Sequence, residues 1–328
     1  MAAGGDNKTF DLGVDLGGTK VAVCSSDFEK IDDVSERVMR FPSHITGSQE
    51  ELVDTLFSSI DTYIENKCAG KLPRAIGFGL KDAVDNRKGI WLKCPSSEGF
   101  SPLPLAELVY ERYGVPAFLD NDVHAATLAE LQYGAGQRYK DFLYLNVGTG
   151  IAVGAVIEGK LMRGASNYAG EIGHISVETE GETCTFCGLP GCLENIASGQ
   201  GINEITQKAL SNNQDSLLQQ TLKAHGFIRS TDVFSAADMG DELAQSIADR
   251  VTRALVIACV DAVNIFNPEA IIFGGGVMSD GWLLTRLQDL VPRRAIATSA
   301  AALQELSLSE LGSDYVGVLG ALSIAQMG

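Results

Sequence analysis

One stretch of the chain, residues 164–194, gathers most of the side chains that can bind a metal ion. Three of the seven cysteines and one of the four histidines lie in it. Thiolates and an imidazole are the ligands of a closed tetrahedral zinc site. Since protein would fill every ligand position, we expect a structural zinc rather than a catalytic one. The predicted ligands are His174, Cys184, Cys187 and Cys192.

The cysteines have two other interpretations. They could be small buried core residues, or Cys184 and Cys187 could form a redox pair. A redox pair with this spacing stands at the start of a helix, whereas Gly188, Pro190 and Gly191 disfavour a helix here. Zinc is therefore the favoured interpretation.

Two carboxylates, Glu171 and Glu194, flank the predicted metal site in the sequence. A zinc ion would fix their positions. Rigidly held carboxylates suit the recognition of polyhydroxylated ligands, because each accepts several hydroxyl hydrogen bonds.

Residues 10–25 predict two strands joined by a glycine turn. The backbone amides of Gly17 and Gly18 can approach an anion, and Asp15 can face a magnesium ion through water. Thr19 and Lys20 add a hydroxyl and a cation nearby. An ordinary hairpin turn is the alternative.

The same pattern returns at residues 142–157, with Gly148, Thr149 and Gly150 in the turn. This internal repeat indicates two related halves. Two such hairpins could hold the phosphates of one nucleotide from both sides. Three glycines that end a buried strand, Gly274, Gly275 and Gly276, could lie flat against adenine, although a tight turn from strand to helix is the alternative.

Asn121 and Asp122 stand where a predicted strand, residues 115–119, passes into a helix. Ligands collect at such strand ends, although Asp122 could simply cap the helix. Other helices are expected at residues 48–66, 105–113, 198–224, 236–266 and 317–325, with the last one amphipathic. Strands are expected at 74–80 and 270–277, and an irregular connector at 81–105.

Composition narrows the classes of partner. The 328 residues suffice for two domains, and a net charge of -17 argues against binding to nucleic acid. Residues 1–10 do not have the pattern of a secretory signal, and no apolar run approaches the roughly 20 residues of a membrane helix. Isolated cysteines fit a reducing compartment. We expect a cytoplasmic protein with no membrane partner.

Together the motifs resemble the ROK family of sugar kinases over nearly the whole chain. The matching segments are DLGGTK (15–20), NVGTG (146–150), AGEIGH (169–174), CGLPGCLE (187–194) and FGGGV (273–277). The resemblance implies a duplicated α/β fold of the ribonuclease H-like type shared by actin, Hsp70 and hexokinase, with a central cleft between two domains. We expect a smaller domain at 1–119, with a helix at about 315–328 packing back on it, and a larger one at 120–314.

The resemblance also implies transfer of the terminal phosphoryl group of ATP, with Mg²⁺, to a sugar hydroxyl, most often the 6-hydroxyl. It makes Asp122 the catalytic base and assigns Asn121, Glu171, His174 and Glu194 to the sugar. The partners would be a sugar, ATP and a second copy of the chain.

The chain departs from the family pattern in two places. One residue is inserted between Cys184 and Cys187, which predicts a bulged loop with the same metal. Lys81 and Asp82 replace a Pro-Gly step near the sugar, so we expect them either to alter the accepted substituent or to point to solvent.

Two rival functions are a sugar-binding protein without catalysis and a ROK-type repressor. The intact Asp15, Asp122 and hairpins disfavour the first. Repressors carry an N-terminal helix-turn-helix, and few residues precede the first strand here.

Overall fold

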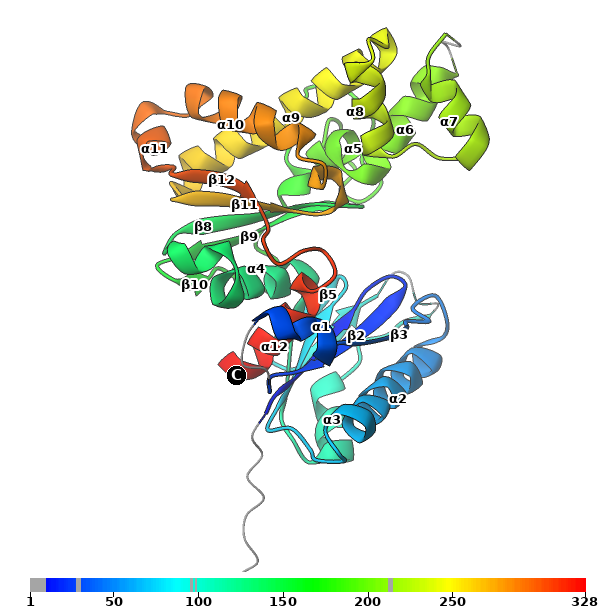
Figure 1. Ribbon diagram of the computed structural model, residues 1–328, viewed down its shortest axis with the longest axis vertical. Coiled ribbons are helices and arrows are strands. Elements are labelled where there is room, and N and C mark those ends of the chain that lie inside the picture. The colour runs from blue at the N-terminus through cyan, green and yellow to red at the C-terminus, as the bar shows by residue number, and fades with distance from the viewer. Residues whose placement is uncertain (1–9, 28–30, 95–96, 98, 212–214) are drawn as a thin grey trace, which may run out of the picture. The chain divides into compact units, whose positions relative to one another are not determined.

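The computed structural model describes residues 10–27, 31–94, 97, 99–211 and 215–328 (Figure 1). Residues 1–9, which contain most of the stretch tested for a secretory signal, lie outside the described residues. Contacts divide the chain into two compact units. Unit 1 contains the chain up to Gln137, Leu161–Ala169 and Glu310–Gly328, and unit 2 contains Arg138–Lys160 and Gly170–Ser309.

Unit 1 is built on a five-stranded sheet with the order β3-β2-β1-β4-β7. The strand β2 pairs antiparallel with both β3 and β1. On the other side of β1, strands β4 and β7 continue the sheet in parallel with it. The glycine hairpin expected at residues 10–25 is β1 and β2. The strands are β1 (Leu12–Leu16), β2 (Lys20–Ser25), β3 (Met39–Pro42), β4 (Ile76–Leu80) and β7 (Ala117–Asn121).

Helices cover both faces of this sheet, because residues of β1 and β4 point alternately to one face and to the other. Leu12, Val14 and Phe78 join the buried cluster formed with α2 (Gln49–Lys67) and α3 (Leu105–Tyr113). On the opposite face, a Cβ atom on Gly13 or Gly77 would lie within 2.7 Å of the backbone of α12 (Val316–Met327). The glycines therefore let this terminal helix pack directly on the strands.

Unit 2 repeats the topology of unit 1. Its sheet has the order β10-β9-β8-β11-β12, with an antiparallel hairpin followed by two parallel additions. This correspondence confirms the internal repeat expected from the sequence. The strands are β8 (Phe142–Val147), β9 (Ile151–Ile157), β10 (Lys160–Leu161), β11 (Ala270–Gly274) and β12 (Glu305–Leu308).

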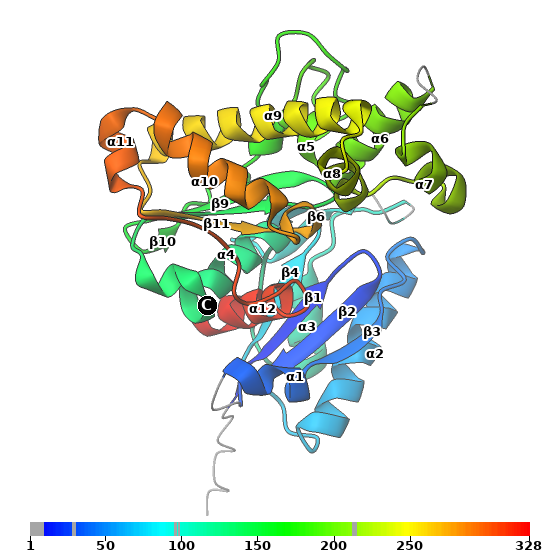
Figure 2. The same cartoon turned by 45° about the horizontal axis from the view of Figure 1, so that its top comes forward.

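The helices of unit 2 gather over one face of its sheet, with α9 and α10 running along it (Figure 2). The α9 helix buries apolar residues on one face, from Ile247 to Val263. The helices of unit 2 are α5 (Leu193–Ala197), α6 (Gly199–Leu210), α7 (Leu218–His225), α8 (Ser230–Asp238), α9 (Glu242–Phe266), α10 (Trp282–Arg294) and α11 (Ala297–Ala302). Two short 3-10 turns, η3 (Ile172–His174) and η4 (Gly276–Met278), also belong to this unit.

Several boundaries differ from the sequence-based expectation. The connector at 81–105 contains a hairpin of β5 (Ala83–Asp85) and β6 (Ile90–Lys93), whose short strands and register shift hide the alternation. The helix expected at 198–224 is two helices, α6 and α7. The helix expected from residue 236 begins at Glu242, because Asp241 caps it. The helix α12 is buried almost all round rather than amphipathic.

The first unit boundary lies after residue 137, beyond the expected one at 119. The difference is mainly helix α4 (Asp122–Tyr133), which packs against α12. A Cβ atom on Gly320 would lie 2.1 Å from the carbonyl oxygen of Ala125, so the two helices approach closely. The other elements of unit 1 are η1 (Ile31–Asp33) and α1 (Val34–Arg37), and η2 (Ala135–Arg138) spans the boundary.

Candidate functional site

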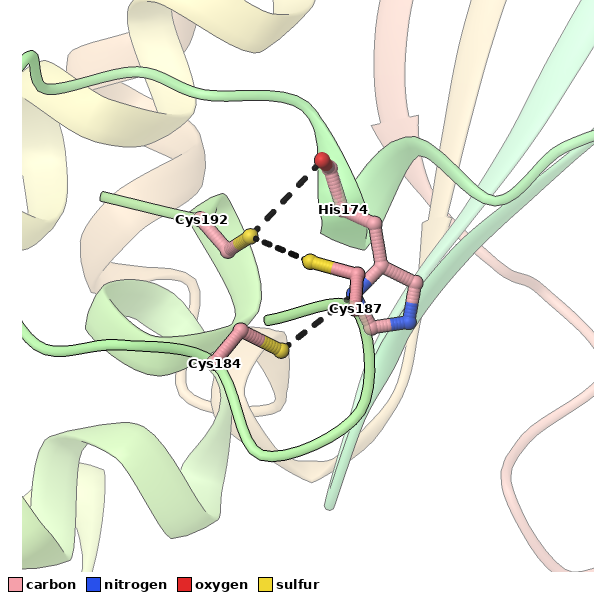
Figure 3. Close-up of side chains that lie close together, drawn as sticks. All are labelled: His174, Cys184, Cys187 and Cys192. Carbon is pink, nitrogen blue, oxygen red and sulfur yellow. Dashed lines mark hydrogen bonds between the residues drawn. The ribbon is translucent and has the colours of Figure 1, made fainter. Parts of the chain in front are cut away.

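The four predicted metal ligands meet in unit 2 (Figure 3). Their ligand atoms all lie within 4.8 Å of one another. The Cys184 Sγ is 3.7 Å from the Nδ1 of His174, and the Sγ atoms of Cys187 and Cys192 are 3.3 Å apart. Three thiols and one imidazole nitrogen at this spacing fit the donor set of a tetrahedral zinc ion.

Local structure brings these ligands together from separate elements. His174 ends the turn η3, and Cys192 precedes α5. The chain turns at Gly191 with a left-handed φ of 69° before it reaches Cys192. Only glycine fits there, because a Cβ atom would lie 2.0 Å from the Glu178 carbonyl oxygen. In the loop with the inserted residue, the ring of Phe186 stacks on the ring of His174 with centroids 4.8 Å apart.

The Glu194 carboxylate links the metal loop to the second glycine hairpin. Its Oε2 accepts a hydrogen bond from the backbone amide of Ile151 at 2.8 Å. Side chains at Gly150 and Gly173 would crowd this carboxylate, at 2.7 and 3.2 Å from the same oxygen. The other predicted carboxylate, Glu171, is exposed at the start of η3.

A pocket of about 790 Å³ adjoins the same hairpin in unit 2. The Gly199 amide at the start of α6 donates to the Gly148 carbonyl at 2.7 Å. Gly275 must be a glycine because its φ is 89° and a Cβ atom would lie 2.3 Å from the Val147 carbonyl. The lining is Gly148, Thr149, Gly199, Gln200, Asn203, Phe227, Ile228, Arg229, Ser230, Thr231, Gly276, Val277 and Ser279.

The predicted nucleotide-binding residues of unit 2 thus fall into two groups. Gly148, Thr149 and Gly276 line the pocket. The other three lie outside this lining: Gly274 packs against β8, Gly275 packs against the hairpin, and Gly150 lies beside the Glu194 carboxylate. The walls contributed by α6 and by the loop between α7 and α8 were not predicted from the sequence.

Asp15 lies beside two glycines in unit 1. A Cβ atom on Gly317 would lie 2.5 Å from its carboxylate, and one on Gly79 would lie 3.6 Å away. Burial, and then the negative charge of Asp122, raise the pKa of Asp15 to about 7. Beyond it Gly18, Thr19 and Lys20 are exposed at the tip of the hairpin, which Gly17 closes by donating to the Lys20 carbonyl at 2.9 Å.

Asn121, rather than Asp122, caps helix α4. Its Oδ1 accepts from the His124 amide at 2.7 Å, which leaves its Nδ2 as the group able to donate to a ligand. Asp122 is the first helical residue, and its Oδ1 accepts from the Val123 amide at 3.0 Å. Loss of hydration against the surrounding protein atoms raises the pKa of Asp122, the Val123 amide and the Lys81 ammonium lower it, and Asp82 raises it. Because the Asp122 side chain is exposed, water screens part of these effects.

A buried polar cluster, which was not predicted from the sequence, lies directly before this pair. Asp120 is 1% exposed. Its carboxylate accepts hydrogen bonds from Nδ1 of His124 at 2.9 Å, Nε of Arg163 at 2.7 Å and Nδ2 of Asn167 at 2.9 Å. Burial alone would raise the pKa of Asp120, but these donors outweigh it and hold the pKa below its usual value. The only local signal in the sequence was the spacing of four residues between Asp120 and His124.

Lys81 and Asp82 differ in environment. Lys81 is exposed, and its carbonyl accepts from the Trp91 indole at 3.0 Å. Asp82 is partly buried and has a left-handed φ of 71°, a conformation that glycine also adopts. Burial raises the pKa of Asp82. The pair lies close enough to Asp122 to influence its charge.

The predicted site residues are divided between the units. Asp15, Gly17, Gly18, Thr19, Lys20, Asn121 and Asp122 belong to unit 1, and the others belong to unit 2. Among the helices of the described residues, none is long and apolar enough to cross a bilayer.

Comparison with known proteins gives consistent matches over most of the chain. The model of the ROK family matches residues 11–327. The sequence is 32% identical over 313 residues to a glucokinase from Halalkalibacterium halodurans, covering 94% of this chain and 92% of that protein. These matches support sugar phosphorylation.

Two solved structures show the same α/β two-domain fold. A ROK family glucokinase from Streptomyces griseus in complex with glucose and AMPPNP aligns with a TM-score of 0.75 and 28% identity, covering 97% of this chain and 100% of that one. A ROK family transcriptional regulator, a homologue of the Escherichia coli Mlc protein, aligns with a TM-score of 0.81 and 25% identity, covering 98% of this chain and 79% of that one. The expected fold class is therefore confirmed, and the family contains both kinases and regulators.

Proposed function

The chain belongs to the ROK family, and from that premise we propose that it is a kinase that transfers the terminal phosphoryl group of ATP to the 6-hydroxyl of a hexose or hexose derivative. Asp122 is the general base. Asn121, Glu171, His174 and Glu194 bind the sugar. The pocket of unit 2 takes the nucleotide, with its phosphates against Gly148, Thr149 and Gly150.

The hydrogen bond between Glu194 and Ile151 carries this proposal. It joins a carboxylate suited to sugar hydroxyls to the hairpin that borders a nucleotide-sized pocket. A carboxylate that already accepts one amide keeps its other oxygen for a ligand. One rigid element of unit 2 thereby serves both substrates, as phosphoryl transfer requires.

Asp122 has the properties that its role demands. Its Oδ1 is oriented by the Val123 amide, so Oδ2 can accept the hydroxyl proton while the sugar oxygen bonds to the terminal phosphorus and ADP departs. The nearby Asp82 favours the protonated form, whereas Lys81 favours the carboxylate. Exposure of the side chain leaves it accessible to a substrate.

The residues also fit two metal ions. Asp15, at the glycine hairpin of unit 1, would hold hydrated Mg²⁺, which neutralises phosphate charge when bound. His174, Cys184, Cys187 and Cys192 would hold a structural Zn²⁺. The zinc loop would fix the positions of Glu171 and Glu194 at its two ends.

Initial rates of ADP formation with a panel of hexoses test the proposal. We expect one or more hexoses to stimulate ADP formation, and the matching 6-deoxy sugar to bind without stimulating it. Equal stimulation by the 6-deoxy sugar would exclude the 6-hydroxyl as acceptor.

A sugar-sensing regulator without kinase activity is the second candidate, favoured by the alignment with the Mlc homologue. A regulator would bind sugar but leave ATP unconsumed, so the same rates separate the two functions. The homodimer expected from the family resemblance stays a prediction, which the molar mass in solution would test.

A further inference from the structure

The nucleotide-sized pocket of unit 2 has a wall that none of the recognised motifs supplies. Its glycine-rich side comes from the second hairpin and the turn after β11. The opposite side comes from residues 227–231, between α7 and α8. This loop carries the pocket's aromatic side chain, Phe227, and Arg229, the one charged residue among the described residues that line it.

The backbone of this loop is fixed. Gly226 ends α7 with a left-handed φ of 73°. The Ile228 amide donates to Oδ1 of Asn203 at 2.8 Å, and the Ile228 side chain is 1% exposed. The Arg229 amide donates to the Asp232 carboxylate at 2.9 Å. These bonds anchor the loop to α6 and α8.

Ile228 therefore determines where its neighbours point. In an extended segment the side chains of residues two apart share a side, and Arg229 is extended, with φ -86° and ψ 156°. Since Ile228 points into the core, Phe227 and Arg229 share the opposite side, where both are exposed. The Arg229 guanidinium lies over the Phe227 ring, 5.3 Å from its centroid.

This pair offers a preformed flat surface at the edge of the pocket. Phe227 is 43% exposed. Aromatic rings and guanidinium planes bind nucleobases by stacking, and the larger purine ring gains more contact than a pyrimidine.

We propose that Phe227 and Arg229 form the base clamp of this pocket and stack on the purine ring of the nucleotide. The inference rests on the proposed kinase function, since it deepens the identity of the phosphoryl donor. It assigns the base to residues 227–229 and leaves the phosphates to the glycine hairpin.

Calorimetric titration of the full chain with ATP, CTP and inorganic tripolyphosphate tests the clamp. Phe227→Ala should weaken ATP binding about 10-fold, because stacking on one base is worth roughly 1–3 kcal/mol. CTP should lose less, and tripolyphosphate should change by less than about twofold. Arg229→Lys should behave like Arg229→Ala, because the flat guanidinium rather than its charge is the contact.

Kinetics give a second readout. In Phe227→Ala and in Arg229→Ala, KM for ATP should rise, while KM for the sugar and kcat should stay near the wild-type values. Leu217→Ala and Arg253→Ala are matched controls in unit 2, since both residues are exposed and neither lines the pocket. Neither control should alter nucleotide binding.

Unchanged ATP affinity in Phe227→Ala would overturn the clamp and leave the kinase proposal intact. Equal losses for ATP and tripolyphosphate in Arg229→Ala would also overturn it, by showing that Arg229 contacts phosphate. Failure of the wild-type chain to bind ATP would remove the clamp and the kinase proposal together.

Discussion

Asp120 at the end of β7 and His124 in the first turn of α4 form a buried pair, with Oδ1 of Asp120 2.9 Å from Nδ1 of His124 and both side chains 1% exposed. The other ring nitrogen of His124 lies 3.3 Å from the Ala169 carbonyl. Carboxylates and carbonyls accept hydrogen bonds, so both ring nitrogens of His124 face an acceptor. This pair connects the start of α4 to residues 163–169 in unit 1.

The first prediction is that Asp120→Asn destabilises unit 1. Loss of the charge leaves Arg163 and His124 without their buried anion, a change that costs about 3 kcal/mol or more. Trp91 is buried in unit 1 and the other tryptophan, Trp282, lies in unit 2. Urea unfolding followed by Trp91 fluorescence in a Trp282→Phe background measures the effect.

Asp61→Asn is the matched control. It removes an exposed ion pair with Arg112 in the same unit, and exposed pairs contribute roughly 0.5 kcal/mol. An Asp120→Asn transition that shifts no further than this control would show that the cluster does not stabilise unit 1.

The second prediction concerns pH. The pKa of Asp15 is about 7 in the folded chain, because burial and then the charge of Asp122 raise it from its usual 3.8. Between pH 3.8 and about pH 7, Asp15 therefore binds more protons in the folded state than in the unfolded state. The contribution of Asp15 to the free energy of unfolding falls as pH rises through this range, and it is constant above about pH 7. Asparagine does not titrate, so the stability of Asp15→Asn relative to wild type should increase when the pH is raised from about 5 to about 8.

Thermal unfolding without added magnesium measures this difference. Asp122→Asn serves as a partial control, because removal of the neighbouring charge should narrow the pH range of the effect. A stability difference between Asp15→Asn and wild type that is independent of pH would contradict a raised pKa.

The third prediction is one zinc ion per chain, found by elemental analysis of protein purified without added zinc. Cys187→Ser should lose most of it and weaken sugar binding, because the metal loop fixes Glu194. Cys68→Ser, a change at a buried cysteine of unit 1, should retain the metal. Wild-type protein that is active and free of metal would exclude the site.

The fourth prediction is that Lys81→Pro combined with Asp82→Gly changes sugar specificity. Glycine fits the left-handed φ at residue 82, so the fold should tolerate the change. The ratio of kcat/KM between a plain and a derivatised hexose should shift about 10-fold, the effect of one lost or gained contact.

Asp82→Asn separates the two causes in this experiment. Asparagine tolerates the same backbone conformation but removes the charge. A ratio unchanged in both variants, with ATP affinity intact, would show that the pair points to solvent.

Local patterns made much of this structure predictable. The period-2 alternation and glycine turns located both hairpins, and the spacing of Leu52, Leu56 and Ile60 located α2. The cysteine spacing identified ligands that the structure brings within 4.8 Å of one another. Each of these signals comes from residues close together in the chain.

The features that escaped prediction depend on distant contacts. Asp120 meets Arg163 and Asn167 across 43 and 47 residues, a pairing that no local pattern encodes. The exposed Phe227 and Arg229 look like ordinary loop residues until Ile228 is seen to be buried. The division between the units lies after residue 137 rather than 119, because helix α4 packs on α12 and so belongs to unit 1. This contact joins residues far apart in the sequence.

The most direct test of the kinase function is the mass of the sugar after incubation with ATP and Mg²⁺. The account predicts that a hexose gains one phosphoryl group for each ADP formed, and that folded Asp122→Ala does so ~10² to 10⁴ times more slowly. If folded wild-type protein binds ATP but phosphorylates none of the hexoses, or if Asp122→Ala matches its rate, the account is contradicted.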